Sequence, residues 1–296
     1  MTAQEILTKA RSEGWALGAF NAGNIEILKA IVGASQNQRS PVIIETSAGE
    51  AEHFGMKNFL TVVENFRQET NLPIFTNFDH GPGLEECQGA IEAGYNLVHF
   101  DGSSLPYEEN IKITKALVDQ ARQKSQGDLG GQAHQKGILV EGEIDKIVGE
   151  SKYHEELAES VQATGSYTEP QRAADFVSQA GVDILAVFVG NLHGTYKTPP
   201  KLDVERLKMI RRQVGCFFSL HGGSGLLAED IKEVIKLGVV KININTELRL
   251  AFRQTLENVL RGSDEVAIYK IMPPVIAAVQ KVVEEKIQLF GSEGKL

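Results

Sequence analysis

Eight short runs of apolar, β-forming residues alternate along the chain with segments of helical periodicity, and this alternation restricts the fold more than any other feature. Runs such as ILAVFV are apolar throughout, as in strands buried on both faces of a parallel sheet, whereas antiparallel strands would alternate apolar and polar residues. The eight runs are Leu17–Phe20, Pro41–Thr46, Pro73–Phe78, Asn96–Phe100, Ile138–Gly142, Asp183–Val189, Cys216–Leu220 and Val239–Ile242. They predict an α/β fold, a (β/α)8 TIM barrel that forms a single domain over residues 1–296.

Segments between the runs repeat apolar residues at helical spacing, and they predict the helices that separate the strands. Examples are Glu85–Ala93, Tyr107–Lys124, Pro170–Ala180 and Ala228–Leu237. The competing fold is a doubly wound open sheet. No G-x-G-x-x-G follows the first strand and no G-x-x-x-x-G-K-[ST] occurs, so the sequence favours the barrel.

Two polar segments interrupt this rhythm. Residues 125–137 form a glycine-rich insertion, and residues 145–168, rich in Glu, Ser, His and Tyr, separate the fifth strand from its helix. We expect both to be mobile, and the second to lie on the catalytic face, where long βα loops act as lids or carry catalytic groups. His134 and His154 fall in these segments, so we interpret both as solvated surface histidines.

The formal net charge of −9 argues against nucleic acid and anionic membranes as partners, so any bound phosphate must be held by a local site. The amino-terminal segment is amphipathic and lacks the features of a secretory signal. No apolar run is long enough to span a bilayer. We therefore expect a cytoplasmic protein.

Three histidines, each followed by glycine, stand at the ends of predicted strands: His80, His193 and His221. The carboxyl ends of barrel strands meet at one face, so residues far apart in sequence can converge there. Neutral imidazole is the commonest zinc ligand, and three protein ligands leave a coordination position for substrate. The three together predict a catalytic metal centre, although each alone would fit a half-buried, hydrogen-bonded histidine at least as well.

Three carboxylates accompany these histidines. Asp79 precedes His80 and could serve as a base toward a substrate hydroxyl, or cap the following helix. Glu141 and Glu143 share one side of a strand because side chains alternate with period two. They could bind the metal or its ligands, or be solvated charges on an edge strand.

Two glycine- and amide-rich segments predict a phosphate site. LHGGSG precedes a helix, where backbone N–H groups and Ser224 could cradle a phosphate, although the segment could also be a tight turn. KININTE supplies Asn243, Asn245 and Thr246 after the eighth strand. Barrels of this type commonly bind phosphate between the loops that follow strands seven and eight.

A series of segments matches one family in order over nearly the whole chain. The segments are GAFNAGNIE, ETSAGEAEHFG, NFDHG, HFDGSS, PYEENIKITK, VEGE, GNLHGTY, LHGGSG, KININTEL and LFGSEGK. On these motifs the chain resembles the class II, zinc-dependent ketose-bisphosphate aldolases, the fructose- and tagatose-bisphosphate aldolase group.

The resemblance implies roles for individual residues. Zinc ligands are implied at His80, His193 and His221, a carboxylate that contacts metal in an alternative position at Glu143, and the acid–base group at Asp79. The residues that match the pocket for the ketone fragment and its phosphate are Ser47, Gly194, Gly222, Ser224, Asn243, Asn245 and Thr246. Asn21 matches less closely a residue near the substrate.

The implied activity is reversible aldol cleavage of a phosphorylated ketose to dihydroxyacetone phosphate and an aldehyde, as in glycolysis and related carbohydrate metabolism. Asp79 would take the proton of the C4 hydroxyl as the C3–C4 bond breaks. The implied cofactor is one catalytic Zn²⁺, with cobalt or iron as alternatives and a monovalent cation as a further option. The implied partners are a small phosphorylated sugar and further copies of the chain, in a homodimer or homotetramer.

Two positions depart from the family pattern. Ser151 stands where the family has the glutamate that transfers a proton to carbon, with Glu150, Glu155 and Glu156 nearby. Ile276 stands where the family has an arginine that clamps the distal phosphate. These departures leave two alternatives open: an aldolase for a ketose 1-phosphate without the distal phosphate, and a non-catalytic protein that binds metal and phosphate.

Overall fold

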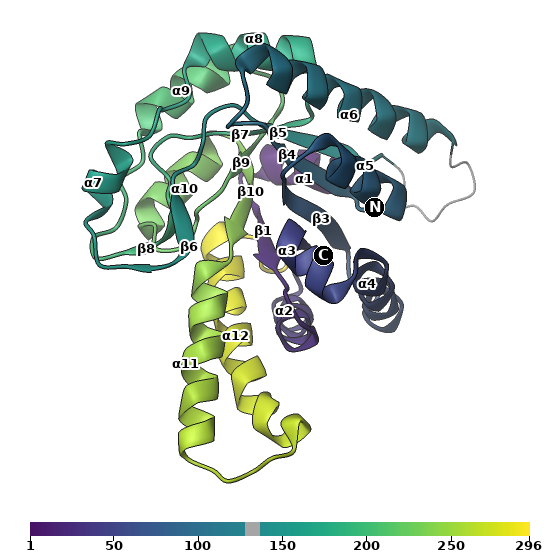
Figure 1. Cartoon of the computed structure of the whole chain (residues 1–296), viewed down its shortest axis with the longest axis vertical. Coiled ribbons are helices and arrows are strands. Elements are labelled where there is room, and N and C mark those ends of the chain that lie inside the picture. Colours follow the sequence, from purple (N-terminus) through teal and green to yellow (C-terminus); the bar gives the residue numbers. More distant parts are fainter. Residues whose placement is uncertain (128–136) are drawn as a thin grey trace.

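Eight parallel strands close into a barrel, with helices around its outside, in the computed structural model, which describes residues 1–127 and 137–296 (Figure 1). The strand order around the barrel is β1-β10-β9-β7-β5-β4-β3-β2. These strands are β1 (Leu17–Asn21), β2 (Val42–Ser47), β3 (Ile74–Gly81), β4 (Leu97–Asp101), β5 (Leu139–Glu143), β7 (Ile184–Ala186), β9 (Phe217–Leu220) and β10 (Val239–Ile244). Each coincides with one of the predicted runs, so the (β/α)8 TIM barrel is confirmed.

A second, two-stranded sheet corrects one prediction. The sixth barrel strand, β7, ends at Ala186 and not at Val189, and His193 opens strand β8 (His193–Tyr196), which pairs with β6 (Gly149–His154). The chain turns at Gly190, whose φ of +101° suits glycine and where a Cβ atom would lie 2.6 Å from the carbonyl oxygen of Lys201. Residues 187–189 are apolar because they are buried, not because they continue the strand.

The helices alternate with the strands as predicted. They are α1 (Ala3–Glu13), α2 (Ile25–Gln38), α3 (Ala48–Phe54), α4 (Met56–Thr70), α5 (Leu84–Ala93), α6 (Tyr107–Gly127), α7 (Ala158–Gln162), α8 (Pro170–Ala180), α9 (Val204–Gln213), α10 (Ala228–Lys236), α11 (Thr246–Arg261) and α12 (Ile268–Phe290). The bounds of α8 agree with the prediction because Pro170 fixes its first turn and Gly181 ends it in the left-handed conformation. None of the helices in the described part of the chain is both long and apolar enough to cross a membrane.

The predictions for the two polar segments, residues 125–137 and 145–168, have different outcomes. Residues 125–127 belong to α6, and residues 128–136, with His134, lie outside the described residues. Residues 145–168 contain β6 and α7, so this segment has regular structure. The surface interpretation of His154 is wrong, because its side chain is 10% exposed and its ring stacks on Tyr196 at a centroid distance of 4.5 Å. The pairing of β6 with β8 brings these two rings together.

The barrel interior changes character along its axis. At the amino ends of the strands, Leu17, Phe75 and Leu97 belong to one apolar cluster with Ile6 and Leu7 of α1, so this helix seals that end. Buried polar side chains replace apolar ones farther along, and we call them the polar layer: Glu45, Asn77, Glu141, Ser219 and Lys241. A TIM barrel interior is normally filled by branched apolar residues, so the polar layer indicates a function at the carboxyl ends.

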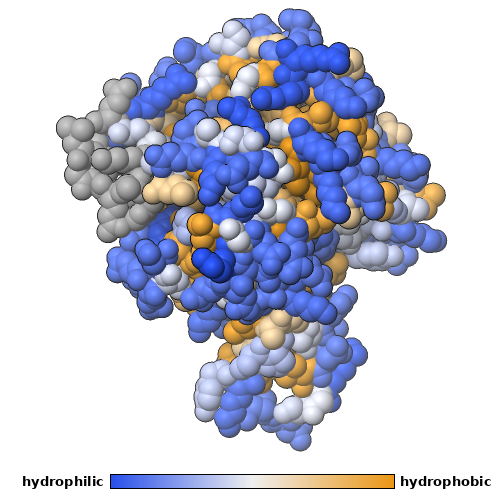
Figure 2. Space-filling view, turned by 180° about the vertical axis from the view of Figure 1, so that it is seen from behind, coloured by the Kyte–Doolittle hydropathy of each residue, from blue (hydrophilic) through white to orange (hydrophobic). Residues whose placement is uncertain are grey.

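Helices α11 and α12 form a hairpin that projects from the barrel (Figure 1). At its tip Val266 and Tyr269 are 87% and 77% exposed. Figure 2 shows hydrophobic residues among hydrophilic ones on this projection.

Candidate active site

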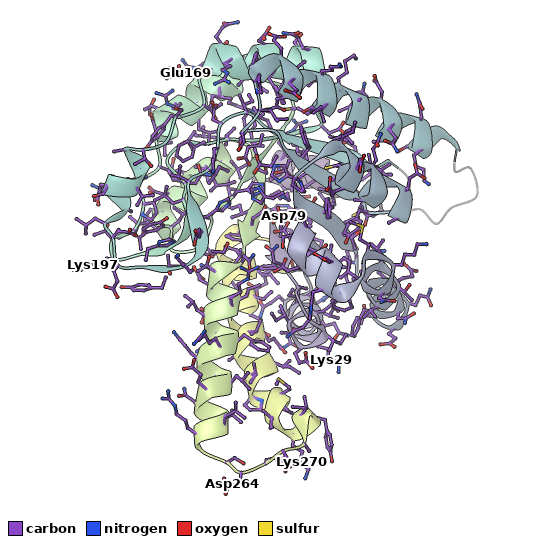
Figure 3. The ribbon with its side chains drawn as sticks, in the orientation of Figure 1. Lys29, Asp79, Glu169, Lys197, Asp264 and Lys270 are labelled. Carbon is purple, nitrogen blue, oxygen red and sulfur yellow. The ribbon has the colours of Figure 1, made fainter. Side chains whose placement is uncertain are left out.

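A cavity of about 420 Å³ opens at the carboxyl ends of the barrel strands. It is lined by these predicted site residues: Ser47, Asp79, His80, His193, Gly194, His221, Gly222, Ser224, Asn243, Asn245 and Thr246. Glu143 does not line the cavity and is 1% exposed at the end of β5. Figure 3 places Asp79 near the middle of the molecule and Lys197 at its outer edge. The structure thus brings the predicted residues together from elements that are far apart in sequence.

Strand β3 presents two neighbouring side chains, Asp79 and His80, to the same cavity. In a regular strand they would point to opposite faces. His80 has a φ of +49°, in the left-handed region that non-glycine residues seldom adopt, and this local turn breaks the alternation. The strained backbone therefore places a carboxylate and an imidazole side by side.

Asp79 does not cap a helix, since the N-cap of α5 is Gly83. Its carboxylate is 4% exposed and accepts hydrogen bonds from the amides of Asn243 (3.0 Å) and Asn21 (3.3 Å). Burial alone would raise the pKa of Asp79, but the nearby His80 and other positively charged groups lower it well below its usual range. The carboxylate is therefore ionised at neutral pH and can accept a proton.

His80 and His221 face each other through ring nitrogens 3.0 Å apart, Nε2 of His80 and Nδ1 of His221. The other nitrogen of each ring meets a carboxylate: His80 Nδ1 lies 3.1 Å from Asp101, and His221 Nε2 lies 2.7 Å from Glu141. These partners assign the ring protons to the outer nitrogens, so the inner two each carry a lone pair. Two lone pairs in this arrangement suit a cation between them, and a carboxylate behind each imidazole is typical of metal sites.

His193 approaches the same point, with ring centroids 4.9 Å from His80 and 6.3 Å from His221. Burial, reinforced by His80, lowers the pKa of His193 to about 3, and burial together with Lys241 lowers the pKa of His221 well below its usual value. Both imidazoles are therefore neutral at pH 7, the form that binds metal. The ring of His193 is thus close to the two facing imidazoles, although His193 stands outside the group Asp79, His80, His99 and His221, whose donor atoms converge.

The two glutamates of β5 are buried, and β5 lies between β4 and β7, so they are not solvated charges on an edge strand. Glu143 is 3.9 Å from His80 Nδ1 and 3.5 Å from His99 Nε2. Burial raises the pKa of Glu143. Glu143 thus lies beside the predicted metal ligands, whereas Glu141 supports His221 from below.

His99 and Asp101 were missed by the sequence analysis. His99 lies between His80 and His221, with both ring centroid distances 4.6 Å, and its Nδ1 accepts the backbone N–H of His80 at 3.2 Å. Because that lone pair is already used, His99 positions the backbone of His80 and is a poorer candidate ligand. Both residues lie at the end of β4, two positions apart, as Glu141 and Glu143 do on β5, but His99 is not followed by the glycine that follows the other three histidines.

The predicted phosphate side is built from the ends of β9 and β10. Gly222 has a φ of +62°, and a Cβ there would lie 2.1 Å from the carbonyl oxygen of Leu192, so glycine is required. The helix that follows LHGGSG, α10, starts at Ala228 as predicted, with Leu226 and Leu227 between it and Gly225. Helix α11 begins at Thr246 beside the cavity, and its N-cap, Asn245, makes no side-chain capping bond. Its first N–H groups suit an anion.

Ser151 and Ile276 are the two positions that depart from the family pattern, and only the first of them lies at the cavity. Glu150 and Ser151 both line it, with Lys146 close by along the chain. Ile276 instead packs in α12 against the hydrophobic core, and lines a different surface cavity with Tyr269. Arg249, one turn into α11, lines the site cavity and pairs with Glu50 at 2.7 Å. Arg249 does not stand out in the sequence, because the resemblance places the phosphate-clamping arginine at position 276.

Residues 1–295 match the family model described as "Fructose-bisphosphate aldolase class-II". The chain belongs to the class II fructose-bisphosphate aldolase family. It is 34% identical over 297 residues to a fructose-bisphosphate aldolase of Staphylococcus aureus, which covers 99% of this chain and 97% of that protein. This class II aldolase is therefore a lyase, and the resemblance in its motifs is confirmed.

Solved structures agree with this assignment. The class II aldolase superposes on the YdjI aldolase of Escherichia coli K12 with a TM-score of 0.79 and 31% identity, over 100% of this chain and 99% of that one. A putative fructose-1,6-biphosphate aldolase of Coccidioides immitis gives 0.80 and 28%, over 99% and 97%. Membership of a metal-dependent family agrees with the clustered imidazoles and carboxylates of Asp79, His80, His99 and His221.

Proposed function

We propose that this aldolase reversibly cleaves a ketose 1,6-bisphosphate of the fructose or tagatose type to dihydroxyacetone phosphate and a phosphorylated aldehyde. The facing ring nitrogens of His80 and His221, with ionised Asp79 between two asparagine amides in the same cavity, carry this proposal. The proposed cofactor is one catalytic Zn²⁺, because three imidazole ligands suit zinc. When bound, the cation supplies Lewis-acid stabilisation of the charge that develops on the ketose oxygens.

Asp79 supplies the proton transfer at the aldehyde half. Its carboxylate takes the proton of the C4 hydroxyl while the C3–C4 bond breaks, and the electron pair of that bond passes to the ketone half as an enediolate. Asn21 and Asn243 hold the two oxygens of Asp79 in place through their amide groups. In the condensation direction the same carboxyl returns the proton.

Glu150 is the proposed group that takes a proton from the hydroxymethyl carbon in the condensation direction and, after taking up a proton from solvent, gives one to the enediolate carbon in cleavage. It lines the cavity, while its neighbour Ser151 has no acidic group and Glu156 pairs instead with His154 at 3.4 Å. The side chain of Glu150 is 73% exposed and pairs with Lys152 of the same strand. It can therefore turn toward a bound substrate without leaving a buried charge behind.

The test of this function is cleavage and exchange by the zinc-loaded protein. We expect it to cleave a ketose bisphosphate and to exchange a hydroxymethyl proton of dihydroxyacetone phosphate with deuterium from solvent, as followed by NMR. In Glu150→Gln the exchange should slow by roughly 100-fold or more. Zinc-loaded protein that neither cleaves nor exchanges would contradict the proposal.

The distal phosphate has a candidate partner in Arg249, which favours a bisphosphate over a 1-phosphate substrate. Its guanidinium lines the cavity, and Glu50, its partner, also accepts hydrogen bonds from the Ser47 hydroxyl (3.0 Å) and the Asn21 amide (3.0 Å). A guanidinium placed by a carboxylate beside a hydroxyl suits a phosphate.

Arg249→Met should therefore lower kcat/KM for fructose 1,6-bisphosphate by roughly 10- to 100-fold, since hydrogen bonds to charged groups contribute about 1.5–3 kcal/mol. Turnover of fructose 1-phosphate should change little. Arg253→Met is the matched control, because Arg253 lies one turn farther along α11, is 79% exposed and pairs with Glu257. Equal losses on both substrates would assign Arg249 to another role.

A further inference from the structure

Lys241 is a fully buried ammonium group inside the barrel, on strand β10. Burial removes the water around a charge, so a buried lysine persists only where other groups compensate it. Its Nζ lies 2.9 Å from Glu141 Oε2 and 3.7 Å from Glu45 Oε2, and donates to Asn243 Oδ1 at 2.8 Å. The proposed reaction uses none of these contacts directly.

Glu141 divides its two oxygens between the lysine and the metal site. Oε2 faces Lys241, while Oε1 accepts hydrogen bonds from Ser219 Oγ at 2.5 Å and from His221 Nε2 at 2.7 Å. Over residues 1–127 and 137–296 the structure gives Oε2 no other hydrogen bond or ion pair. Lys241 on one oxygen, together with Ser219 and His221 on the other, therefore sets the rotation of this carboxylate about its axis.

The rotation of Glu141 in turn decides which nitrogen of His221 faces the site. An imidazole can present either nitrogen to a metal, and the hydrogen bond made by the other nitrogen selects one. With Nε2–H donated to Glu141, the lone pair of Nδ1 faces His80.

We propose that Lys241 is a positioning residue for the metal, which acts through Glu141 to fix the tautomer and orientation of His221. The inference rests on the proposed function for the metal itself. The proposed chain consists of three residues: Lys241 on β10, Glu141 on β5 and His221 at the end of β9. Their contacts orient the imidazole of His221 before a metal binds. Two members of the polar layer, Glu141 and Lys241, would therefore orient a metal ligand.

A double-mutant cycle tests this chain with Lys241→Met, Glu141→Gln and the double variant. Zinc affinity is measured by competition with a chelator of known affinity, and the absorption spectrum of the Co²⁺-substituted protein reports the ligand geometry. Each single variant should bind zinc roughly 10- to 100-fold more weakly, as expected when a partner of a metal ligand is removed. The double variant should lose no more than Glu141→Gln alone, because both act through one path.

The double variant also keeps the test valid if Lys241→Met alone fails to fold, because it leaves no unpaired charge between positions 141 and 241 and nearly conserves volume. The matched control is Lys236→Met, since Lys236 is 68% exposed and pairs with Glu233 on a surface helix. Unchanged zinc affinity in Lys241→Met, or losses that multiply in the double variant, would overturn the inference. Wild-type protein that binds no zinc would instead overturn the proposed function.

Discussion

His193→Ala is expected to leave the protein folded but nearly free of zinc and nearly inactive. Burial and His80 keep the pKa of His193 at about 3, so no proton competes for its ring nitrogen at neutral pH. If the bound cation contributes about 4 kcal/mol to transition-state stabilisation, its loss lowers kcat/KM on the order of 1,000-fold. Metal content by mass spectrometry and the rate of bisphosphate cleavage measure the two effects.

His53→Ala is the matched control for this prediction, because His53 is an exposed histidine on α3 that does not line the cavity. It should retain both zinc and activity. Chelation of the wild-type protein should reproduce the loss seen in His193→Ala, and added Zn²⁺ should reverse it in the wild type only. A His193→Ala protein that retains full zinc and full activity would remove His193 from the metal centre.

Asp79→Asn should slow cleavage by about 100- to 10,000-fold while the protein keeps its zinc. The amide conserves the shape of the side chain but cannot accept the C4 hydroxyl proton. The expected zinc content is unchanged because His80, His193 and His221 remain. Single-turnover cleavage of the bisphosphate, at saturating substrate, measures the effect on the chemical step.

The same variant separates the two proton transfers. Exchange of the hydroxymethyl proton of dihydroxyacetone phosphate does not involve the C4 hydroxyl, so Asp79→Asn should retain it, whereas Glu150→Gln should lose it. Loss of exchange together with cleavage in Asp79→Asn would mean that Asp79 serves both steps or holds the metal.

Much of the fold could be predicted because barrel strands are buried on both faces and therefore appear as uninterrupted apolar runs. All eight strands were found in this way, and His80 and His221 follow from their strand ends. The position of His193 could not be derived similarly. Its approach depends on the turn at Gly190 and on the pairing of β6 with β8, both of which are tertiary features.

Residues that act from inside the barrel were harder to find. Apolarity identifies a strand but does not say what a polar residue within it does, so Lys241 in VVKINI and His99 in LVHFD gave no signal by themselves. Arg249 was missed for another reason. A guanidinium reaches the cavity from the first turn of α11, whereas Ile276, at the family position, packs elsewhere.

Helix α1 closes the barrel at the amino ends of its strands, and this closure has a kinetic consequence. With that end filled by apolar side chains, the proposed ketose and both of its fragments would have to pass through the one opening at the carboxyl ends of the strands. A rigid ligand that spans this opening would act as an inhibitor of both directions at once, without any contact to the cation.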